Sequence, residues 1–175
     1  MALWVFGYGS LLWNPGFDPV EAVRARLEGY HRSFCMLSIH HRGTQDHPGL
    51  VLALDSADTG CTGVAFQVAE AEEDRVMAEL RERELVSSAY LEKLLPVTLA
   101  DGREVQAVTY VIDPAHVQYC HYPLEKQAHM IATAHGQRGP NVDYLENTAA
   151  HLTQMGICDD EMAWLVQRVR ALRAG

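Results

Sequence analysis

Apolar and polar residues alternate with a period of two in the first third of the chain. From residue 23 to residue 28, apolar side chains alternate with charged ones, which is typical of a strand with one buried face. Residues 34–39 and 50–54 are further apolar runs, and they flank a polar loop at residues 40–49 that contains glycine and proline. Residues 63–68 form another short run, so this part of the chain is predicted to be mainly β.

The middle of the chain predicts one helix and one hairpin. Residues 69–85 are acidic at the start and rich in Glu, Arg, Ala, Leu and Met, a composition that favours a helix. Residues 90–99 and 104–112 are strand-like, and the dipeptide Asp101-Gly102 between them is a strong hairpin signal. We therefore expect these two segments to pair as antiparallel strands.

The last third of the chain has a helical pattern. Residues 124–134 are predicted to form one helix, and Asn141 is a candidate cap for a second. Either Asp159 or Asp160 is expected to cap the last helix. The apolar stripe of that helix would consist of Met162, Leu165, Val166, Val169 and Leu172. The whole pattern predicts an α+β fold with a mainly antiparallel sheet, and it leaves an open sheet and a closed barrel as alternatives.

Composition and charge narrow the class of protein. A chain of 175 residues with 48% hydrophobic content can bury the core of one domain, which we expect to span residues 1–175. The formal net charge of −9 argues against a nucleic-acid partner, because phosphates would be repelled. No apolar run approaches the roughly 20 residues that cross a bilayer, and no signal peptide is visible. We expect a cytoplasmic protein without a membrane partner, and the sequence leaves its oligomeric state open.

The nine histidines and four cysteines lack the spacing of a metal site. His40 and His41 are adjacent, so on a strand they would point to opposite faces. The other histidines lack a tight arrangement such as H-E-x-x-H, and the cysteines form no C-x-x-C pair. We therefore expect free thiols and no metal.

The segment from Trp4 to Trp13 joins an apolar strand to a turn of small residues. It reads Trp-Val-Phe-Gly-Tyr-Gly-Ser-Leu-Leu-Trp. Gly7, Gly9 and Ser10 carry little or no side chain, so several backbone N–H groups can face a ligand at close range. Such a concavity suits a carboxylate or a phosphate, while a purely structural turn is the alternative.

A carboxylate also lies on the apolar face of the predicted mid-chain helix. At about 100° per residue, Val76, Met77 and Leu80 share one face. Glu84 falls on that same face, whereas Glu82 points to the other side. Partial burial would raise the pKa of Glu84 toward the range useful for acid–base catalysis, while a solvated glutamate at a frayed helix end is the alternative.

Four segments together resemble the ChaC-type γ-glutamylcyclotransferases. Residues 6–13, Phe-Gly-Tyr-Gly-Ser-Leu-Leu-Trp, are similar to the signature loop of that family. Arg83-Glu84 matches the Arg-Glu pair of that family. His41-Arg42-Gly43 lies in the loop after a predicted strand, where the family also has an Arg-Gly. Residues 139–145 resemble its Asn-x-x-Tyr-Leu segment. The four segments occur in the family's order.

The resemblance implies a small β-barrel with flanking helices and an enzyme that cleaves glutathione to 5-oxoproline and Cys-Gly without a cofactor. It implies Glu84 as the catalytic residue, with Glu82 as an alternative because Arg-Glu occurs twice in a row. The expected substrate-binding residues are Tyr8, Gly9, Ser10, Leu11, Arg42 and Tyr144. A solvated loop position for Arg42 and a packed core position for Tyr144 are the structural alternatives. Two other functions stay open: a cyclotransferase for other γ-glutamyl amines or amino acids, and a non-catalytic γ-glutamyl-binding module.

Overall fold

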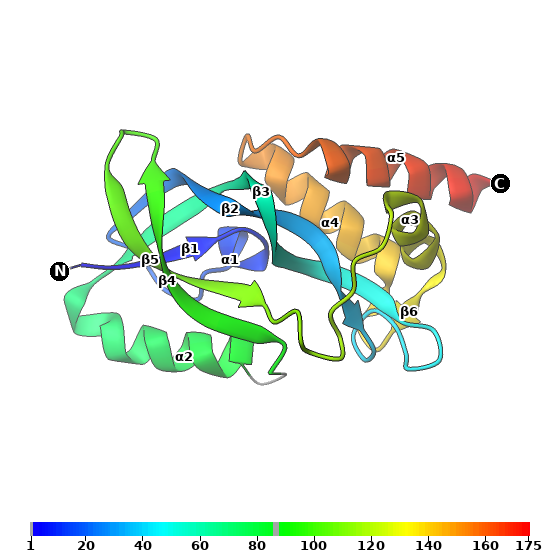
Figure 1. The fold of residues 1–175 in the computed structure, drawn as a ribbon, viewed down its shortest axis with the longest axis horizontal. Helices are drawn as coiled ribbons and strands as arrows, with labels where there is room; N and C mark the ends of the chain where they lie inside the picture. Colours follow the sequence, from blue (N-terminus) through cyan, green and yellow to red (C-terminus); the bar gives the residue numbers. More distant parts are fainter. Residues whose placement is uncertain (1, 86–87) are drawn as a thin grey trace. The chain divides into compact units, whose positions relative to one another are not determined.

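Five strands form a closed barrel in the order β1-β3-β2-β4-β5 (Figure 1). The computed structural model describes residues 2–85 and 88–175. The barrel strands are β1 (Leu3–Gly7), β2 (Glu21–Ser38), β3 (Gly49–Val68), β4 (Tyr90–Leu99) and β5 (Glu104–Ile112). β1 runs antiparallel to β3 and parallel to β5, and the β2–β4 and β4–β5 pairs are antiparallel. The mainly antiparallel barrel that the family resemblance implies is therefore confirmed.

β2 and β3 are longer than the apolar runs that predicted them. The runs at residues 23–28 and 34–39 both fall in or at the end of β2, and the two later runs both belong to β3. The polar residues between them do not end either strand. A barrel strand is held by backbone hydrogen bonds, which polar residues make as well as apolar ones.

The helical elements follow the predicted pattern closely. They are α1 (Ser10–Trp13), η1 (Glu70–Glu72), α2 (Glu73–Leu85), α3 (Leu124–Thr133), α4 (Asn141–Gln154) and α5 (Asp160–Ala174). The predicted mid-chain helix is the short 3-10 turn η1 followed by α2. Asp159 caps α5, because its Oδ1 accepts a hydrogen bond from the Met162 N–H at 3.0 Å. Among the described residues, no helix is both long enough and apolar enough to cross a membrane.

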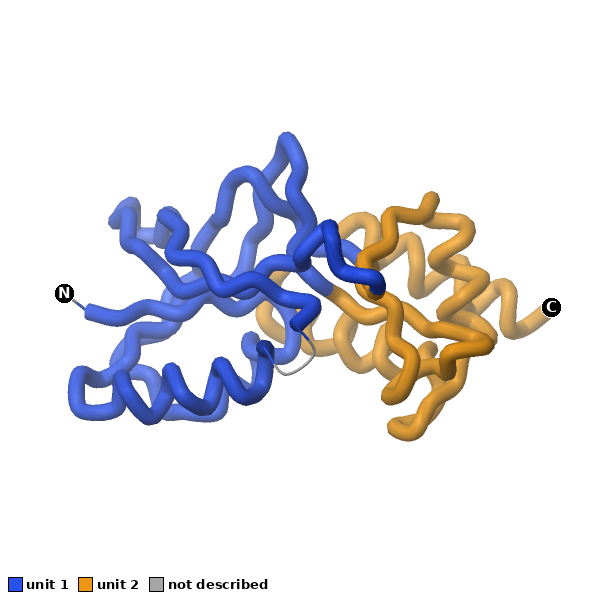
Figure 2. Tube along the Cα trace, turned by 60° about the horizontal axis from the view of Figure 1, so that its bottom comes forward, with its two compact units in different colours: residues 1–33, 53–117 blue, residues 34–52, 118–175 orange. Residues whose placement is uncertain are grey.

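The chain divides into two compact units (Figure 2). Unit 1 comprises residues 1–33 and 53–117, and unit 2 comprises residues 34–52 and 118–175. In unit 1, α2 packs against the barrel through a buried cluster. The members of this cluster are Val5, Leu11, Val68, Val76, Leu80, Val108 and Tyr110. In unit 2, α3, α4 and α5 pack against one another, beside the short strand pair β6 (His135–Gly136) and β7 (Gly139–Pro140).

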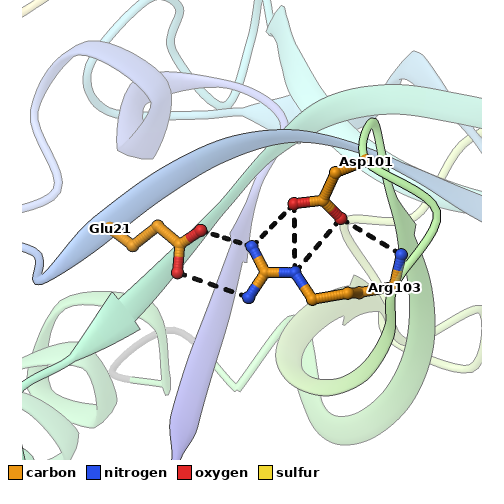
Figure 3. A network of polar contacts seen from close by, with 3 residues as sticks. All are labelled: Glu21, Asp101 and Arg103. Carbon is orange, nitrogen blue, oxygen red and sulfur yellow. Dashed lines mark hydrogen bonds and ion pairs between the residues drawn. The ribbon is translucent and has the colours of Figure 1, made fainter.

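An arginine ties the β4–β5 hairpin of unit 1 to the beginning of β2 (Figure 3). The predicted turn forms at Asp101-Gly102, where Gly102 has a φ of +93°. The Arg103 guanidinium donates to both carboxylate oxygens of Asp101 and also to Glu21. It also lies 5.7 Å from the centre of the Trp4 ring. The hairpin therefore has a defined position relative to β1 and β2.

The side chain of Asn141 does not cap α4, contrary to the sequence-based expectation. The N-cap residue is Pro140, and Asn141 is the first residue of the helix. The Asn141 side chain is completely buried, where Oδ1 accepts from the Leu50 N–H at 2.8 Å and Nδ2 donates to the Leu50 carbonyl at 2.9 Å. Gly49 permits this approach, because a Cβ there would lie 2.7 Å from Asn141 Oδ1. The amide thus pairs with β3 as another strand would.

Replacing this amide should destabilise the protein. Asn141→Ala leaves the buried N–H and carbonyl of Leu50 without their partners. We expect the free energy of unfolding to fall by about 3 kcal/mol, the usual cost of leaving buried polar groups unpaired. Urea denaturation measures the change. Asn147→Ala, at an exposed position of the same helix, is the matched control, and equal losses in the two variants would contradict the assignment.

Candidate active site

The turn after β1 is formed by close packing around two glycines. A Cβ on Gly7 would lie 3.2 Å from the side chains of both Leu11 and Phe66, so a larger residue would press on its neighbours. A Cβ on Gly63, in the neighbouring strand β3, would lie 2.2 Å from the Gly7 carbonyl oxygen. The small residues therefore let β3 and α1 approach the end of β1.

Gly9 is buried, yet a Cβ at this position would meet no atom within 4 Å. The turn therefore borders open space on this side. Leu12 N–H donates to the Gly9 carbonyl at 2.8 Å, which begins α1. The N–H groups of Ser10 and Leu11 precede this first bond, so they have no acceptor within the helix. Tyr8, Gly9, Ser10 and Leu11 thus form a turn that is open on the Gly9 side, and its role as a binding site stays a prediction.

A buried arginine that the sequence reasoning missed supports the same turn. Arg32 of β2 is 7% exposed, and its Nε donates to the Tyr8 carbonyl at 2.7 Å. Its Nη2 donates to the Thr62 carbonyl at 2.6 Å, so it joins β2, β3 and the turn. Its position has the same strand parity as the buried Phe34 and Met36, and this parity is the signal that could have identified it.

Glu84 lies in the last turn of α2 on the buried face of that helix. Val76 and Leu80 on this face are buried, and the Glu84 side chain is only 14% exposed. Burial raises the pKa of the Glu84 carboxyl, while the nearby Arg83 charge acts in the opposite direction. Glu82 is exposed, as expected for the other side of the helix. Of the two candidate carboxylates, Glu84 is the one in a desolvated environment.

Arg83 connects Glu84 to α1. Its Nη1 donates to the Asn14 carbonyl at 2.7 Å, and its Nη2 donates to Ser10 Oγ at 2.7 Å. Its Nε lies 3.5 Å from Glu84 Oε1. The predicted catalytic carboxylate and the predicted binding turn are therefore brought together in unit 1.

A second carboxylate of unit 1, that of Glu92, is surrounded by hydrogen-bond donors. Glu92 of β4 accepts two hydrogen bonds from Arg81, at 3.0 and 3.1 Å, and one from the Tyr110 hydroxyl at 2.8 Å. The bonds from Arg81 lower the pKa of Glu92. The pKa of Tyr110 is raised mainly by burial and by its bond to Glu92, with a smaller contribution from the negative charge of Glu84. The sequence reasoning missed this network, because its members lie on three separate elements.

Arg42 and Tyr144 lie together in unit 2. Arg42 Nη1 donates to the Arg138 and Pro140 carbonyls at 2.9 and 3.2 Å, and the guanidinium lies 5.8 Å from the Tyr144 ring centre. The Tyr144 hydroxyl accepts from the Leu52 N–H at 3.1 Å. Both side chains thus have well-defined partners within unit 2, and their role in substrate binding stays a prediction.

Two residues of the Asn-x-x-Tyr motif bind the same strand. The Asn141 amide pairs with Leu50, and the Tyr144 hydroxyl binds the backbone of Leu52, two residues further along β3. Residues three apart lie side by side on a helix, and residues two apart lie on one edge of a strand. The motif therefore joins the first turn of α4 to β3.

Comparison with known proteins places the chain in a family. A family model described as ChaC-like protein matches residues 3–172. The chain belongs to the ChaC-like family. The glutathione-specific γ-glutamylcyclotransferase of Escherichia coli K12 is 36% identical over 173 residues, which cover 98% of this chain and 74% of that protein. γ-Glutamylcyclotransferase 2-3 of Arabidopsis thaliana is 35% identical, over 97% of this chain and 89% of that protein.

A solved structure has the same fold as this ChaC-like chain. The crystal structure of a yeast γ-glutamylcyclotransferase specific to glutathione matches with a TM-score of 0.84, covering 98% of this chain and 97% of that one. The sequence identity in this comparison is 22%, so it supports the fold alone. Within residues 2–85 and 88–175, no group of three or more His, Cys, Asp or Glu side chains is arranged to hold a metal ion.

Proposed function

We propose that this ChaC-like protein is a γ-glutamylcyclotransferase that cleaves glutathione to 5-oxoproline and Cys-Gly. The observation that carries the proposal is the desolvated Glu84 carboxylate, which Arg83 connects to the turn after β1. The names of the relatives, including the 36% identical protein of Escherichia coli, support this activity and substrate. We further propose that both units belong to one γ-glutamylcyclotransferase-like domain, residues 1–175, of a cytoplasmic protein.

The reaction is intramolecular. The α-amine of the γ-glutamyl group attacks the γ-carbonyl carbon of the same group, which closes a five-membered lactam. The C–N bond to cysteine then breaks, and Cys-Gly leaves as an amine. Because the amine and the carbonyl are already tethered, the protein mainly has to hold the substrate in a folded, near-attack conformation. No electrons are transferred, so this chemistry requires no redox cofactor.

Proton transfer gives Glu84 its role. The α-ammonium form of the substrate is not a nucleophile, so a base must remove a proton before ring closure. We assign this step to the Glu84 carboxylate, which passes the proton to the leaving nitrogen. The ring nitrogen loses a second proton as the lactam forms, and the same carboxylate carries it to Cys-Gly, so both protons lost by the α-ammonium end on the released amine. Partial burial favours proton removal, because a raised pKa makes the carboxylate a stronger base.

The turn after β1 is assigned to binding of the γ-glutamyl end. Backbone N–H groups from Tyr8 to Leu11 suit its α-carboxylate, and the open space at Gly9 leaves room for it. Arg42 and Tyr144 stay predicted substrate-binding residues. A non-catalytic binding module is less consistent with this arrangement, because a nearby Glu84 carboxylate would repel a bound carboxylate without contributing to affinity.

Removing the base should abolish turnover while the protein remains folded. Glu84→Gln is nearly isosteric but cannot accept the proton, so we expect kcat to fall by a factor of about 10² to 10⁴. The assay is release of 5-oxoproline from glutathione. Glu82→Gln, at the exposed position two residues earlier, should stay close to wild type. The reverse pattern would place the base at Glu82.

Bulk in the turn should weaken substrate binding. Gly9→Val directs a branched side chain into the open space beside the turn, where we place the substrate carboxylate. We expect a large increase in KM for glutathione, and a smaller one in Gly9→Ala, while circular dichroism confirms folding. A folded Gly9→Val protein with unchanged KM and kcat would exclude this turn from the binding site.

Glutathione should be a better substrate than shorter or simpler γ-glutamyl compounds. Contacts to the Cys-Gly portion would help to hold the γ-glutamyl group in its cyclising conformation, so truncation should lower kcat/KM and also kcat. Glutathione, γ-glutamylcysteine and γ-glutamylalanine are compared by 5-oxoproline release. Equal efficiency with γ-glutamylalanine would favour a broader γ-glutamylcyclotransferase, and binding without turnover of any of the three would favour the binding module.

A further inference from the structure

The Arg83 side chain binds both ends of α1. Ser10, whose Oγ accepts from Arg83 Nη2, is the first residue of this helix. Asn14, whose carbonyl accepts from Nη1, is its C-cap residue. Two hydrogen bonds of 2.7 Å from one planar guanidinium therefore attach the whole short helix to the last turn of α2. Such a fork fixes direction as well as distance.

The same guanidinium is turned toward Glu84. Because both Nη atoms bind α1, the Nε edge is left to face the carboxylate, at 3.5 Å from Oε1. The Arg83 side chain is 30% exposed and that of Glu84 is 14% exposed, so their interaction is only partly screened by water. Any displacement of α1 would therefore also displace the cation beside Glu84.

We propose that Arg83 is a positioning residue that holds the Glu84 carboxylate and the turn after β1 in one fixed arrangement. This role rests on the proposed function, because the turn and the carboxylate act on two parts of the same substrate. Arg83 would contribute through two separable effects. Its positive charge lowers the pKa of Glu84, and its paired hydrogen bonds hold α1 and the adjoining turn in place.

The charges around Glu84 determine the direction of the expected pH effect. Arg83 lowers the pKa of Glu84 and thereby opposes burial. Tyr110 of β5 lies close enough for the Glu84 charge to contribute to its raised pKa, and it stays neutral in the range where Glu84 titrates. On β4, Tyr90 packs against the same cluster, and Glu92 is bound to Arg81 and Tyr110. Loss of the Arg83 charge should therefore raise the pKa of Glu84 further.

The sign of the kinetic effect follows from the role of the base. Glu84 must be deprotonated to accept the proton from the substrate, so activity rises as the pH increases through its pKa. In Arg83→Gln, the acidic limb of the kcat profile should move to higher pH. Arg83→Lys keeps the positive charge but not the planar fork. Its acidic limb should stay near that of wild type, while KM for glutathione rises about tenfold, the loss expected for one charge-assisted hydrogen bond.

Two further variants test the two effects of Arg83 separately. Ser10→Ala tests the hydrogen bond to α1, and Arg75→Gln controls for the loss of a positive charge elsewhere on α2. Ser10→Ala removes one acceptor and leaves the Arg83 charge in place, so KM should rise without a shift of the acidic limb. Arg75→Gln removes one positive charge from the same helix α2. Arg75 binds Glu72 and Glu79 at exposed positions. We therefore expect kcat, KM and the acidic limb of the kcat profile to be unchanged in Arg75→Gln.

The decisive experiment titrates Glu84 directly. ¹³C NMR of the glutamate side-chain carboxyls, assigned with Glu84→Gln, follows this group without requiring turnover. We expect the Glu84 titration to move to higher pH in Arg83→Gln, and to change little in Arg83→Lys and Arg75→Gln. An unchanged Glu84 titration in folded Arg83→Gln would overturn the proposal, as would an unchanged KM in both Ser10→Ala and Arg83→Lys. Wild-type protein that releases no 5-oxoproline would instead reject the proposed function, and the titration would still test the coupling of Arg83 to Glu84.

Discussion

The packing of α2 against three barrel strands is the constraint on which the proposed active site depends. Val76 and Leu80 of α2 are buried against side chains of β1, β3 and β5 in one cluster. Burial of each such side chain contributes about 1.5–3 kcal/mol, so the rotation of α2 about its axis is strongly determined. Glu84 follows Leu80 by one turn on the same face and is therefore partly buried. Leu11 belongs to this cluster too, so the same packing fixes α1 beside the turn.

Two carboxylates of unit 1 illustrate how environment assigns their roles. Glu92 receives hydrogen bonds from Arg81 and Tyr110 and is held as a stable anion. Glu84 is buried and faces Arg83 at 3.5 Å, so its pKa is raised while that of Glu92 is lowered. These opposite shifts follow from burial at Glu84 and from hydrogen bonds at Glu92. Glu92 is thus a structural partner of Tyr110, and Glu84 is the carboxylate to which we assign the proton transfer.

The Asn-x-x-Tyr motif of unit 2 has a structural explanation within that unit. Asn141 and Tyr144 bind alternate positions of β3, Leu50 and Leu52, and Arg42 binds the two carbonyls of Arg138 and Pro140 before α4. A buried amide or hydroxyl needs partners, and here the backbone of β3 provides them. Residues that resemble a family motif can therefore be retained for packing, for binding or for both. The substitution of Asn141 tests the packing role through stability.

The sequence by itself determined the α+β class, the hairpin at Asp101-Gly102 and the apolar face that carries Glu84, because these features follow from local periodicity and turn chemistry. The order of four sequence motifs indicated the family. The periodicity left an open sheet and a closed barrel as alternatives, and only the family resemblance predicted the barrel. The tertiary structure alone decided the use of Asn141 as a partner of β3 instead of a cap, the burial of Arg32 beneath the turn and the attachment of Arg83 to α1. These contacts join residues that are distant in sequence, and local patterns contain no information about which distant backbone groups need a partner. That requirement arises only when folding removes those groups from water.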